Sequence, residues 1–475
     1  MIMELTTTYI GQQSWMLTVG TVRVLVDPVL TASFGNSDEL RFEIWPPRRV
    51  EIDDLPAVDA VVVTNEHLDH FHVPSLRMLP PETTVLVPSV LPQVCIDAIE
   101  MIGLRPVLLA HGEPYAIADT VVQLFQGSPD APSWESRVTS LYFGPADSGR
   151  GIFVQSDTEI EMDHSLQQCD PAVYISTHNA QICPPGQLGA FDNMLPVESE
   201  TGRNTVGVDI LQSVLNQPLT LFPQVQYILL SGTGYLQSPR KHGKFLWSDL
   251  GQLEAVANRL SIDTRMVGLT PGQTASFIAG TSTTSRARWV TPLPDTEPDP
   301  DLHGADEIDL NIEPAPIFAE PVDSSDRELI MRELSLMAPL LMLSPLGKAL
   351  INTNSYLGEQ VGSVRFAVCL RGFDDNDCQI LGLDFNRAQF VPVDGDVRSA
   401  LMAIPAGIDC HASDLVAVLR GRIHVWELAT SRLRQWYLTS RLESPVAFLY
   451  SLYSEQVRPD LAEQMYRKAL AAPVS

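Results

Sequence analysis

Basic residues are scarce in this sequence. It has 31 Lys and Arg against 58 Asp and Glu in 475 residues, a formal net charge of −27. A field of that sign repels polyanions, which argues against nucleic acid and anionic membrane surfaces as partners. The sequence also lacks the ~20 consecutive apolar residues of a membrane span, and its start lacks the basic flank and apolar segment of a signal peptide. We therefore expect a cytoplasmic protein with no membrane span and no nucleic-acid partner.

Cysteine is also rare. The six cysteines form no CxxC pair and are scattered along the chain, which argues against a disulfide framework and against a thiolate zinc finger. We expect them to be buried free thiols. Hydrophobic residues make up 45% and charged residues 19% of the sequence, a balance that is typical of a globular protein.

A stretch rich in acidic residues and proline divides the chain. Residues 291–326 carry eleven carboxylates, seven prolines and no Lys or Arg. This composition cannot bury enough apolar surface to offset the entropy of ordering, so it predicts an extended linker. The length of 475 residues also exceeds what a single hydrophobic core usually serves. We predict a first domain over residues 1–285, an acidic Pro-rich linker over 286–326 and a second domain over 327–475.

Apolar periodicity predicts strands and helices in both parts. Close spacing of the first apolar runs favours hairpins, and residues 57–64 form a continuous β-branched run, typical of a strand that is buried on both faces. Strand and helix patterns then alternate, which predicts layers of sheet and helix. The second part reads as a small α+β domain with a helix at 327–350, strands at 364–370, 379–385, 389–393, 423–428 and 432–437, and a closing helix at 459–471.

The loop after the buried strand carries the strongest chemical signal. His67, Asp69 and His70 fall within four residues of one another directly after that strand. Ligand sites lie at the carboxyl ends of strands in open sheets. Two imidazoles and a carboxylate that converge there can bind a divalent metal, because His nitrogen and Asp oxygen are common zinc and iron ligands.

This loop resembles the metal-binding loop of the metallo-β-lactamase superfamily, whose pattern is His-x-His-x-Asp-His. Residues 65–70 read Asn-Glu-His-Leu-Asp-His. Residues 9–15 and 24–28 resemble the first strands of that superfamily, most of all the branch that includes ascorbate-6-phosphate lactonase and CMP-sialic acid hydroxylase. The resemblance implies an α+β fold, with an αββα sandwich over residues 1–285 and a metal site at one edge of its sheets.

The resemblance implies metal ligands at His67, Asp69 and His70, and at Asp157 as the bridging carboxylate that follows a strand. The match is incomplete. Asn65 stands in place of the first histidine, and an amide oxygen is a weaker transition-metal ligand than imidazole.

Two further histidines of the family pattern are missing, near residues 126–130 and 269–274. His178 follows the next apolar strand after Asp157 and is a candidate for a missing nitrogen ligand. Glu66 or Asp130 is a candidate for a further oxygen ligand. The expected cofactor is a divalent metal, zinc or iron.

A partial site of this kind predicts a metal-dependent hydrolase of an ester, lactone or phosphoester, because a metal with an open coordination position activates water. Asp69 and Asp157 are the candidate catalytic residues, as general bases. Two alternatives stay open. A carboxylate-rich set also suits a non-heme iron oxygenase or hydroxylase, and the missing ligands also suit a catalytically inactive binding protein. The expected partner is a small-molecule substrate.

The pattern of the second domain is similar to that of a sterol-carrier-protein-type domain. The resemblance implies an apolar tunnel or lid, and hence a lipid-like substrate. The alternative is a structural or dimerising part, which leaves a homo-oligomer open.

Overall fold

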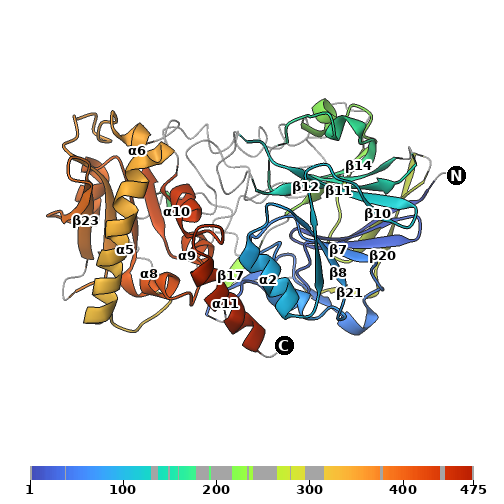
Figure 1. Cartoon of the computed structure of the whole chain (residues 1–475), viewed down its shortest axis with the longest axis horizontal. Helices are drawn as coiled ribbons and strands as arrows, with labels where there is room; N and C mark the ends of the chain where they lie inside the picture. The colour runs from blue at the N-terminus through green and yellow to red at the C-terminus, as the bar shows by residue number, and fades with distance from the viewer. Residues whose placement is uncertain are drawn as a thin grey trace.

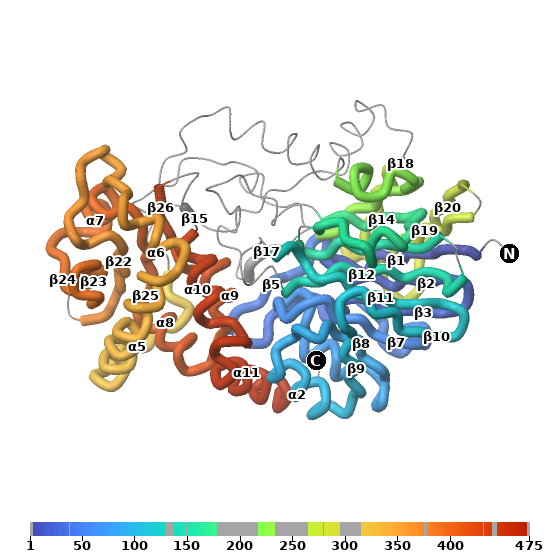
Figure 2. The backbone as a smooth tube through the Cα atoms, turned by 45° about the horizontal axis from the view of Figure 1, so that its top comes forward, coloured from blue at the N-terminus to red at the C-terminus, as the bar shows by residue number. Residues whose placement is uncertain are grey.

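The computed structural model shows two domains side by side (Figures 1 and 2). They are joined through helices α9 (Val425–Ser431), α10 (Pro445–Tyr453) and α11 (Pro459–Ala471). The structure describes residues 3–37, 39–129, 137–147, 150–158, 160–177, 192–193, 217–232, 235–238, 265–278, 280–294, 315–374, 378–438 and 444–472. Everything below refers to these residues.

Two sheets form the first domain. The first sheet has eight strands, in the order β20 (Thr281–Arg286), β19 (Gln273–Ile278), β1 (Leu5–Gly11), β2 (Ser14–Val19), β3 (Val22–Val26), β7 (Ala60–Val62), β8 (Thr84–Pro88) and β9 (Arg105–Leu109). The second sheet has seven, in the order β10 (Tyr115–Ile117), β11 (Thr120–Gln126), β12 (Thr139–Pro145), β13 (Gly151–Val154), β14 (Pro171–Thr177), β16 (Tyr227–Ser231) and β18 (Arg265–Val267). A common apolar core that takes side chains from both sheets holds them together.

The β-branched run contains strand β7, which is buried on both faces, as predicted. Its residues alternate between two cores: Ala60 and Val62 face the second sheet, whereas Val61 and Val63 face the outer layer. That alternation is the physical reason for an unbroken apolar run, because each face of the pleat meets apolar neighbours. The outer layer contains α1 (Val73–Leu76) and α2 (Gln93–Met101), which connect the parallel strands β7, β8 and β9.

Short strands complete the first domain: β4 (Ser33–Phe34), β5 (Arg41–Ile44) and β17 (Tyr235–Ser238) form one small sheet, and β6 (Arg48–Val50) and β21 (Val290–Pro292) form another. Two 3-10 turns, η1 (Ile52–Asp54) and η2 (Leu166–Gln168), lie in its loops. On the outer face of the second sheet, the rings of Phe153 and Tyr174 stack with their centroids 5.2 Å apart, and Phe222 packs against both.

The second domain is built on a six-stranded sheet, in the order β15 (Asp192–Asn193), β26 (Arg434–Tyr437), β25 (Ala406–His411), β22 (Val364–Arg371), β23 (Cys378–Asp384) and β24 (Gln389–Pro392). Its helices are α5 (Ser324–Leu343), α6 (Pro345–Leu350), α7 (Val397–Ala403), α8 (Ala412–Leu419), α9 (Val425–Ser431), α10 (Pro445–Tyr453) and α11 (Pro459–Ala471). Separate apolar clusters cover the two faces of the sheet. The α+β class and the sandwich followed by a second domain are as expected from the sequence.

Two local predictions are wrong. Residues 423–428, predicted as a strand, lead into helix α9, because His424 and Glu427 form a capping box at its start. The predicted helix over 327–350 is interrupted at Ser344, whose hydroxyl accepts a hydrogen bond from the Gly347 amide and begins α6 with Pro345 in its first turn. Apolar content alone does not distinguish these cases.

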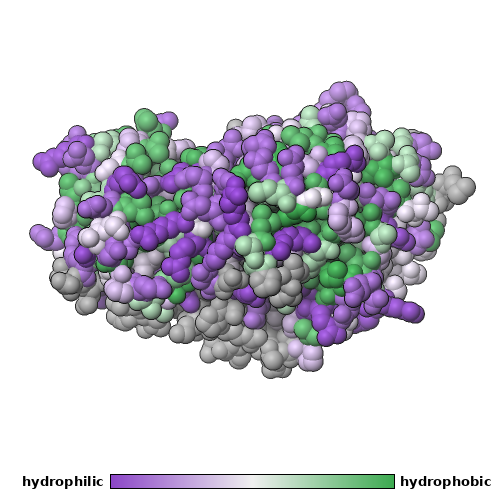
Figure 3. All heavy atoms as spheres, turned by 60° about the horizontal axis from the view of Figure 1, so that its bottom comes forward, coloured by the Kyte–Doolittle hydropathy of each residue, from purple (hydrophilic) through white to green (hydrophobic). Residues whose placement is uncertain are grey.

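Helix α11 joins the two domains. It lies beside α2 in both views (Figures 1 and 2) and places Met465 and Tyr466 in the apolar core of the first domain's outer layer. The Arg77 guanidinium donates to the Ala469 and Ala472 carbonyls, and Lys468 pairs with Glu39 at 2.7 Å. Figure 3 shows hydrophilic side chains gathered across the middle of the lower face, where the domains meet.

The predicted domain boundaries stay a prediction. Residues 281–286 form the edge strand β20, and residues 290–292, inside the predicted linker, pair with β6. Residues 295–314 lie outside the described residues. Among the helices that the structure describes, none combines the length and apolar character needed to cross a membrane.

Candidate metal centre

Three predicted ligands meet at one edge of the sandwich. Asp69 and His70 lie in the loop after β7, in the first sheet, and Asp157 lies in the loop after β13, in the second sheet. Each sheet of the first domain therefore contributes the end of one strand. One donor atom from each of the three side chains lies within 4.8 Å of the other two. All three residues are buried. This is the clustering that the sequence predicted for these three positions.

His70 is held between carboxylates on both sides of its ring. Its Nδ1 lies 2.7 Å from Asp27 Oδ2, and its Nε2 lies 2.7 Å from Asp157 Oδ2 and 3.8 Å from Asp69 Oδ1. Burial alone would lower the pKa of His70, but the charges of Asp157, Asp27 and Asp69 raise it well above its ordinary value. The Nε2 atom is therefore the one that faces the cluster.

Two glutamines of the β1–β2 turn orient the carboxylates. Gln12 Nε2 donates to Asp69 Oδ2 at 3.1 Å, and Gln13 Nε2 donates to Asp157 Oδ1 at 2.9 Å. The Ser231 hydroxyl, at the end of β16, donates to Gln13 Oε1 at 2.7 Å and so fixes the direction of that amide. Burial raises the pKa of Asp69, although His70 and Gln12 oppose the rise.

Asp27 fixes the loop that follows β7 through hydrogen bonds to Thr64 and His70. It follows β3, which runs parallel to β7. Its carboxylate accepts from the Thr64 amide at 2.8 Å and from the Thr64 hydroxyl at 2.7 Å, in addition to the contact with His70. Ser156 Oγ lies 2.9 Å from the same hydroxyl. These residues carry no recognisable ligand spacing, so sequence reasoning missed their roles.

Backbone strain marks the same place. Of the six non-glycine residues that the described chain holds at positive φ, three border the site: Gln12 at 50°, Asp27 at 43° and Ser156 at 57°. Left-handed backbone at residues other than glycine costs free energy and concentrates at functional sites. An aspartate directly after a strand and a two-glutamine hairpin turn are the only sequence signals that pointed to them.

Asn65 shapes the loop and does not face the cluster. Its amide nitrogen donates to the Thr64 hydroxyl at 3.0 Å, and its Oδ1 accepts from the His67 amide at 2.9 Å. Glu66 Oε1 accepts from the Arg137 guanidinium, whereas no hydrogen-bond partner is found for the buried Glu66 Oε2 among the described residues. The hydrogen bonds of Asn65 therefore stay within the loop, and Glu66 uses one of its two carboxylate oxygens.

His67 lies beside the cluster but outside the group of three donors. Its ring centroid is 6.3 Å from that of His70, and burial lowers its pKa. It borders a cavity of about 20 Å³ between the domains, whose other lining residues are Glu66, Arg137, His424, Trp426, Tyr450, Ser454 and Glu455. The second domain thus forms one wall beside the site. That volume suits a single water molecule.

The remaining candidates are not described. His178 and Asp130 lie outside the described residues. The assignment of His67 and His178 as ligands therefore stays a prediction, as do the catalytic roles of Asp69 and Asp157.

Comparisons with known proteins match parts of the chain. Residues 6–165 match a family model described as a beta-lactamase superfamily domain. The first domain has a metallo-β-lactamase-like fold. Over 76 residues the chain is 33% identical to uncharacterized proteins of Mycobacterium tuberculosis and Mycobacterium bovis. The match covers 16% of this chain and 20% of theirs, so the chain spans about a fifth of the length of these relatives.

Three solved structures are similar to part of the chain. Isothiocyanate hydrolase from Delia radicum gut bacteria is 20% identical, with 58% of this chain and 100% of that chain covered and a TM-score of 0.40. A metallo hydrolase of Ignicoccus hospitalis is 12% identical, with 58% and 98% covered and a TM-score of 0.38. CmlA, a diiron beta-hydroxylase from Streptomyces venezuelae, is 14% identical, with 60% and 54% covered and a TM-score of 0.35. Likeness at this level says nothing about what the present chain binds.

Proposed function

We propose that this protein is a metal-dependent hydrolase that acts on an ester, lactone or phosphoester of a small molecule. The observation that carries the proposal is the buried group of Asp69, His70 and Asp157, whose donor atoms lie within 4.8 Å of one another. Three buried ionisable side chains without a role would cost the fold free energy, which favours a functional reason for their convergence.

The donors fit a divalent metal. Two carboxylates and one imidazole are ligands that both zinc and iron accept. A second layer that orients ligands is typical of metal sites, and here Gln12, Gln13 and Asp27 supply it. A metal held by Asp69, His70 and Asp157 would supply Lewis acidity that activates water and polarises the substrate.

The chain's own groups have separate tasks in this proposal. Asp27 sets the tautomer of His70, because a carboxylate on Nδ1 requires a proton there and leaves Nε2 as the donor atom. Asp69 and Asp157 are the proton-accepting groups nearest to the reacting position. The wall that the second domain forms beside His67 excludes bulk water and restricts the size of the substrate.

A second function has one observation in its favour. The described donor set contains two carboxylates for one histidine, and carboxylate-rich sets also hold iron in oxygen-activating proteins. A non-heme iron hydroxylase on the same fold is therefore the alternative.

Metal analysis distinguishes these functions. The full-length protein, purified without chelator, is measured for zinc and iron beside an Asp69→Ala, His70→Ala double variant. The matched control is His111→Ala, Asp163→Ala, which removes an exposed His–Asp pair that lies elsewhere in the same domain. We expect one zinc or more per chain in the wild type and the control, and loss in the first variant.

Activity assays complete the test. Zinc-dependent hydrolysis of p-nitrophenyl acetate, a simple lactone or bis-p-nitrophenyl phosphate supports the hydrolase. Bound iron together with consumption of O₂ supports the hydroxylase. Absence of metal after incubation with either ion would overturn both and favour a binding protein.

The proposal includes narrower expectations. We propose that the protein belongs near the lactonase and hydroxylase branch of the superfamily and that its second domain is sterol-carrier-like and binds a lipid-like substrate, which the substrate assay tests. We also propose a cytoplasmic location, which cell fractionation tests, and self-association, which a measurement of mass in solution tests.

A further inference from the structure

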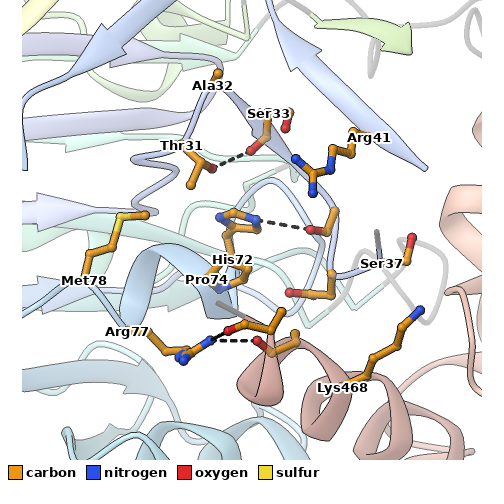
Figure 4. Close-up of a pocket in the computed structure, with 14 residues that line it drawn as sticks. Thr31, Ala32, Ser33, Ser37, Arg41, His72, Pro74, Arg77, Met78 and Lys468 are labelled. Carbon is orange, nitrogen blue, oxygen red and sulfur yellow. Dashed lines mark hydrogen bonds between the residues drawn. The ribbon is translucent and has the colours of Figure 1, made fainter. Parts of the chain in front are cut away.

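A second cavity lies away from the three metal donors. It has a volume of about 200 Å³ and lies between the loop that contains β4, helix α1 and the end of α11 (Figure 4). None of the residues Asp69, His70 and Asp157 lines it. The proposed hydrolase does not use this cavity, so its lining requires its own explanation.

The charged residues that line the cavity are all cationic. They are Arg41, Arg77 and Lys468, and no described carboxylate is part of the lining. Acidic residues outnumber basic ones 58 to 31 in this protein, so three cations around one cavity run against the general composition. Figure 4 shows Arg41 and Lys468 reaching toward the cavity from β5 and α11.

Lys468 and Arg77 have different kinds of partner. Lys468 pairs with Glu39 at 2.7 Å. Arg77 donates to two main-chain carbonyls, and no ion pair with a carboxylate is found for it among the described residues. Arg48 is buried and is not part of the cavity lining. Among the described residues its guanidinium donates to the main-chain oxygens of Ile10, Val29 and Thr31. Arg77 therefore brings to the cavity lining a positive charge that no described carboxylate pairs.

Asn36 presents an unused amide in this cavity. It is 4% exposed, and neither its nitrogen nor its oxygen has a hydrogen-bond partner among the described residues. A buried amide without a partner is costly, and such groups commonly await a ligand or an ordered water. Thr31, Ser33 and Ser37 lie on the same lining. The Thr31 hydroxyl already donates to the Ser33 carbonyl and the Ser37 hydroxyl to Glu427 Oε1, so the Ser33 hydroxyl is the donor that fits a ligand.

His72 does not compete for a ligand. Its Nδ1 lies 2.7 Å from the Ser75 hydroxyl and its Nε2 lies 3.2 Å from the Gly35 carbonyl, so both ring nitrogens are engaged. It forms a neutral polar wall. A cationic set of this kind also repels a metal ion, which leaves anions as the class that fits.

We propose that this cavity binds the oxyanion group of a small molecule, a phosphate or a carboxylate. Asn36 Nδ2 and the Ser33 hydroxyl would donate to the oxyanion, and Arg77, with Arg41 on the same lining, would balance its charge, since guanidinium groups bind both kinds of anion. A volume of about 200 Å³ restricts the ligand to a phosphate or carboxylate with a few additional heavy atoms.

Calorimetric titration of the full-length protein tests this site. The probes are inorganic phosphate and malonate, each at constant ionic strength set with sodium chloride. We expect a Kd in the millimolar range or below for at least one probe. Asn36→Asp, which adds a negative charge at nearly constant shape, should weaken binding at least tenfold, and Arg41→Gln at least threefold.

A matched variant separates the site from general charge. Arg286 is exposed on the edge strand β20, and Arg286→Gln changes the net charge by the same amount as Arg41→Gln. It should bind as the wild type does, and circular dichroism confirms that Asn36→Asp is folded. Preference for phosphate or for malonate assigns the ligand class. No saturable binding of either probe up to 50 mM, or equal binding by both cavity variants and the wild type, would overturn the proposal.

Discussion

His70 has a carboxylate on each ring nitrogen, and the two contacts have different tasks. The contact of Nε2 with Asp157 is the one that a metal would replace or share, whereas the contact of Nδ1 with Asp27 is independent of ligand. Asp27 also accepts from the amide and the hydroxyl of Thr64. A single buried carboxylate therefore fixes both the ring and the loop.

Asp27→Asn should weaken metal binding by about 10–100-fold, the usual effect of losing a partner that orients a ligand. The reason is local: Asp27 Oδ2 accepts from both the His70 ring and the Thr64 hydroxyl, and an amide group presents a donor to at least one of them. Competition with a chromophoric chelator measures the affinity. The control is Asp59→Asn, an exposed aspartate before β7; equal affinities in the two variants would contradict the role of Asp27.

The sequence predicted the clustering of Asp69, His70 and Asp157 but not the residues that orient them. The donors are recognisable because their types and spacing match metal chemistry. Gln12, Gln13 and Asp27 act only through partners 43 to 144 residues away. Such pairings depend on which strands are neighbours in the sheets, and one sequence does not specify that order.

At the scale of elements, side-chain caps determine whether an apolar segment forms a helix or a strand, which its apolar pattern alone does not distinguish. The run at 423–428 has the composition of a strand, yet the Glu427 side chain accepts from the His424 amide and the His424 ring accepts from the Trp426 amide. These bonds satisfy the first amides of α9 and make a helix the better local structure. Strands β22 and β23 were predictable because most of their residues are buried and their sequences carry runs of apolar side chains.

His424 also contacts the Glu455 carboxylate, with Nε2 to Oε1 at 3.2 Å. Burial acts to lower the pKa of His424, but the charge of Glu455 outweighs burial, and the pKa of His424 is raised. Burial acts to raise the pKa of Glu455, but the charge of His424 outweighs burial, and the pKa of Glu455 is lowered. The pair therefore stabilises the fold most at pH values between the unfolded pKa of glutamate, about 4.3, and that of histidine, about 6.5. The contribution of the ion pair is complete below the unfolded pKa of His424, about 6.5, and is lost as pH rises through the higher folded value. The charged ring has a proton on Nδ1, so the bond from the Trp426 amide belongs to the neutral form.

His424→Asn tests this pH dependence, because asparagine keeps the cap of α9 and removes the ion pair. The wild type should exceed the variant in free energy of unfolding by about 1–3 kcal/mol near pH 6. The difference should shrink above the folded pKa of His424 and also as pH falls through that of Glu455. Urea denaturation at pH 4, 6 and 9 measures it, and a difference that is constant with pH would refute the assignment.

Gly407 permits the packing of strand β25 against a tryptophan. A Cβ there would lie 2.2 Å from Trp436 Cζ2 and 2.6 Å from the Ala367 carbonyl oxygen. Gly407→Ala should therefore lower the free energy of unfolding by about 1–3 kcal/mol, the usual cost of overpacking a core. Gly362→Ala is the control, because a Cβ there meets nothing within 4 Å. Chemical denaturation of both variants should separate them clearly, and equal midpoints would exclude the steric explanation.

At the scale of the whole molecule, the two domains share a core. The closing helix α11 was predicted from its periodicity, but not its position against the first domain. Its apolar face suits any partner of similar shape, so sequence alone does not identify which one. As a result, residues from both ends of the chain border the cavity beside His67 and the cationic cavity.

Tyr466 is the residue through which this shared core can be tested. It is fully buried, its ring centroid lies 5.4 Å from that of Phe71, and its hydroxyl donates to Glu455 at 3.1 Å. Tyr466→Ala should cost about 3–5 kcal/mol through the cavity it leaves. Tyr466→Phe removes only the hydroxyl and should cost about 0.5–1.5 kcal/mol.

The number of unfolding transitions in each variant distinguishes a shared core from two independent domains. With a shared core, the wild type and Tyr466→Phe should unfold in one calorimetric transition, whereas Tyr466→Ala should show two, because each domain keeps its own sheet and loses only the contact between them. Independent domains would instead give two transitions already in the wild type. In that case the truncation would move only one of them, and the cavity beside His67 would not depend on α11.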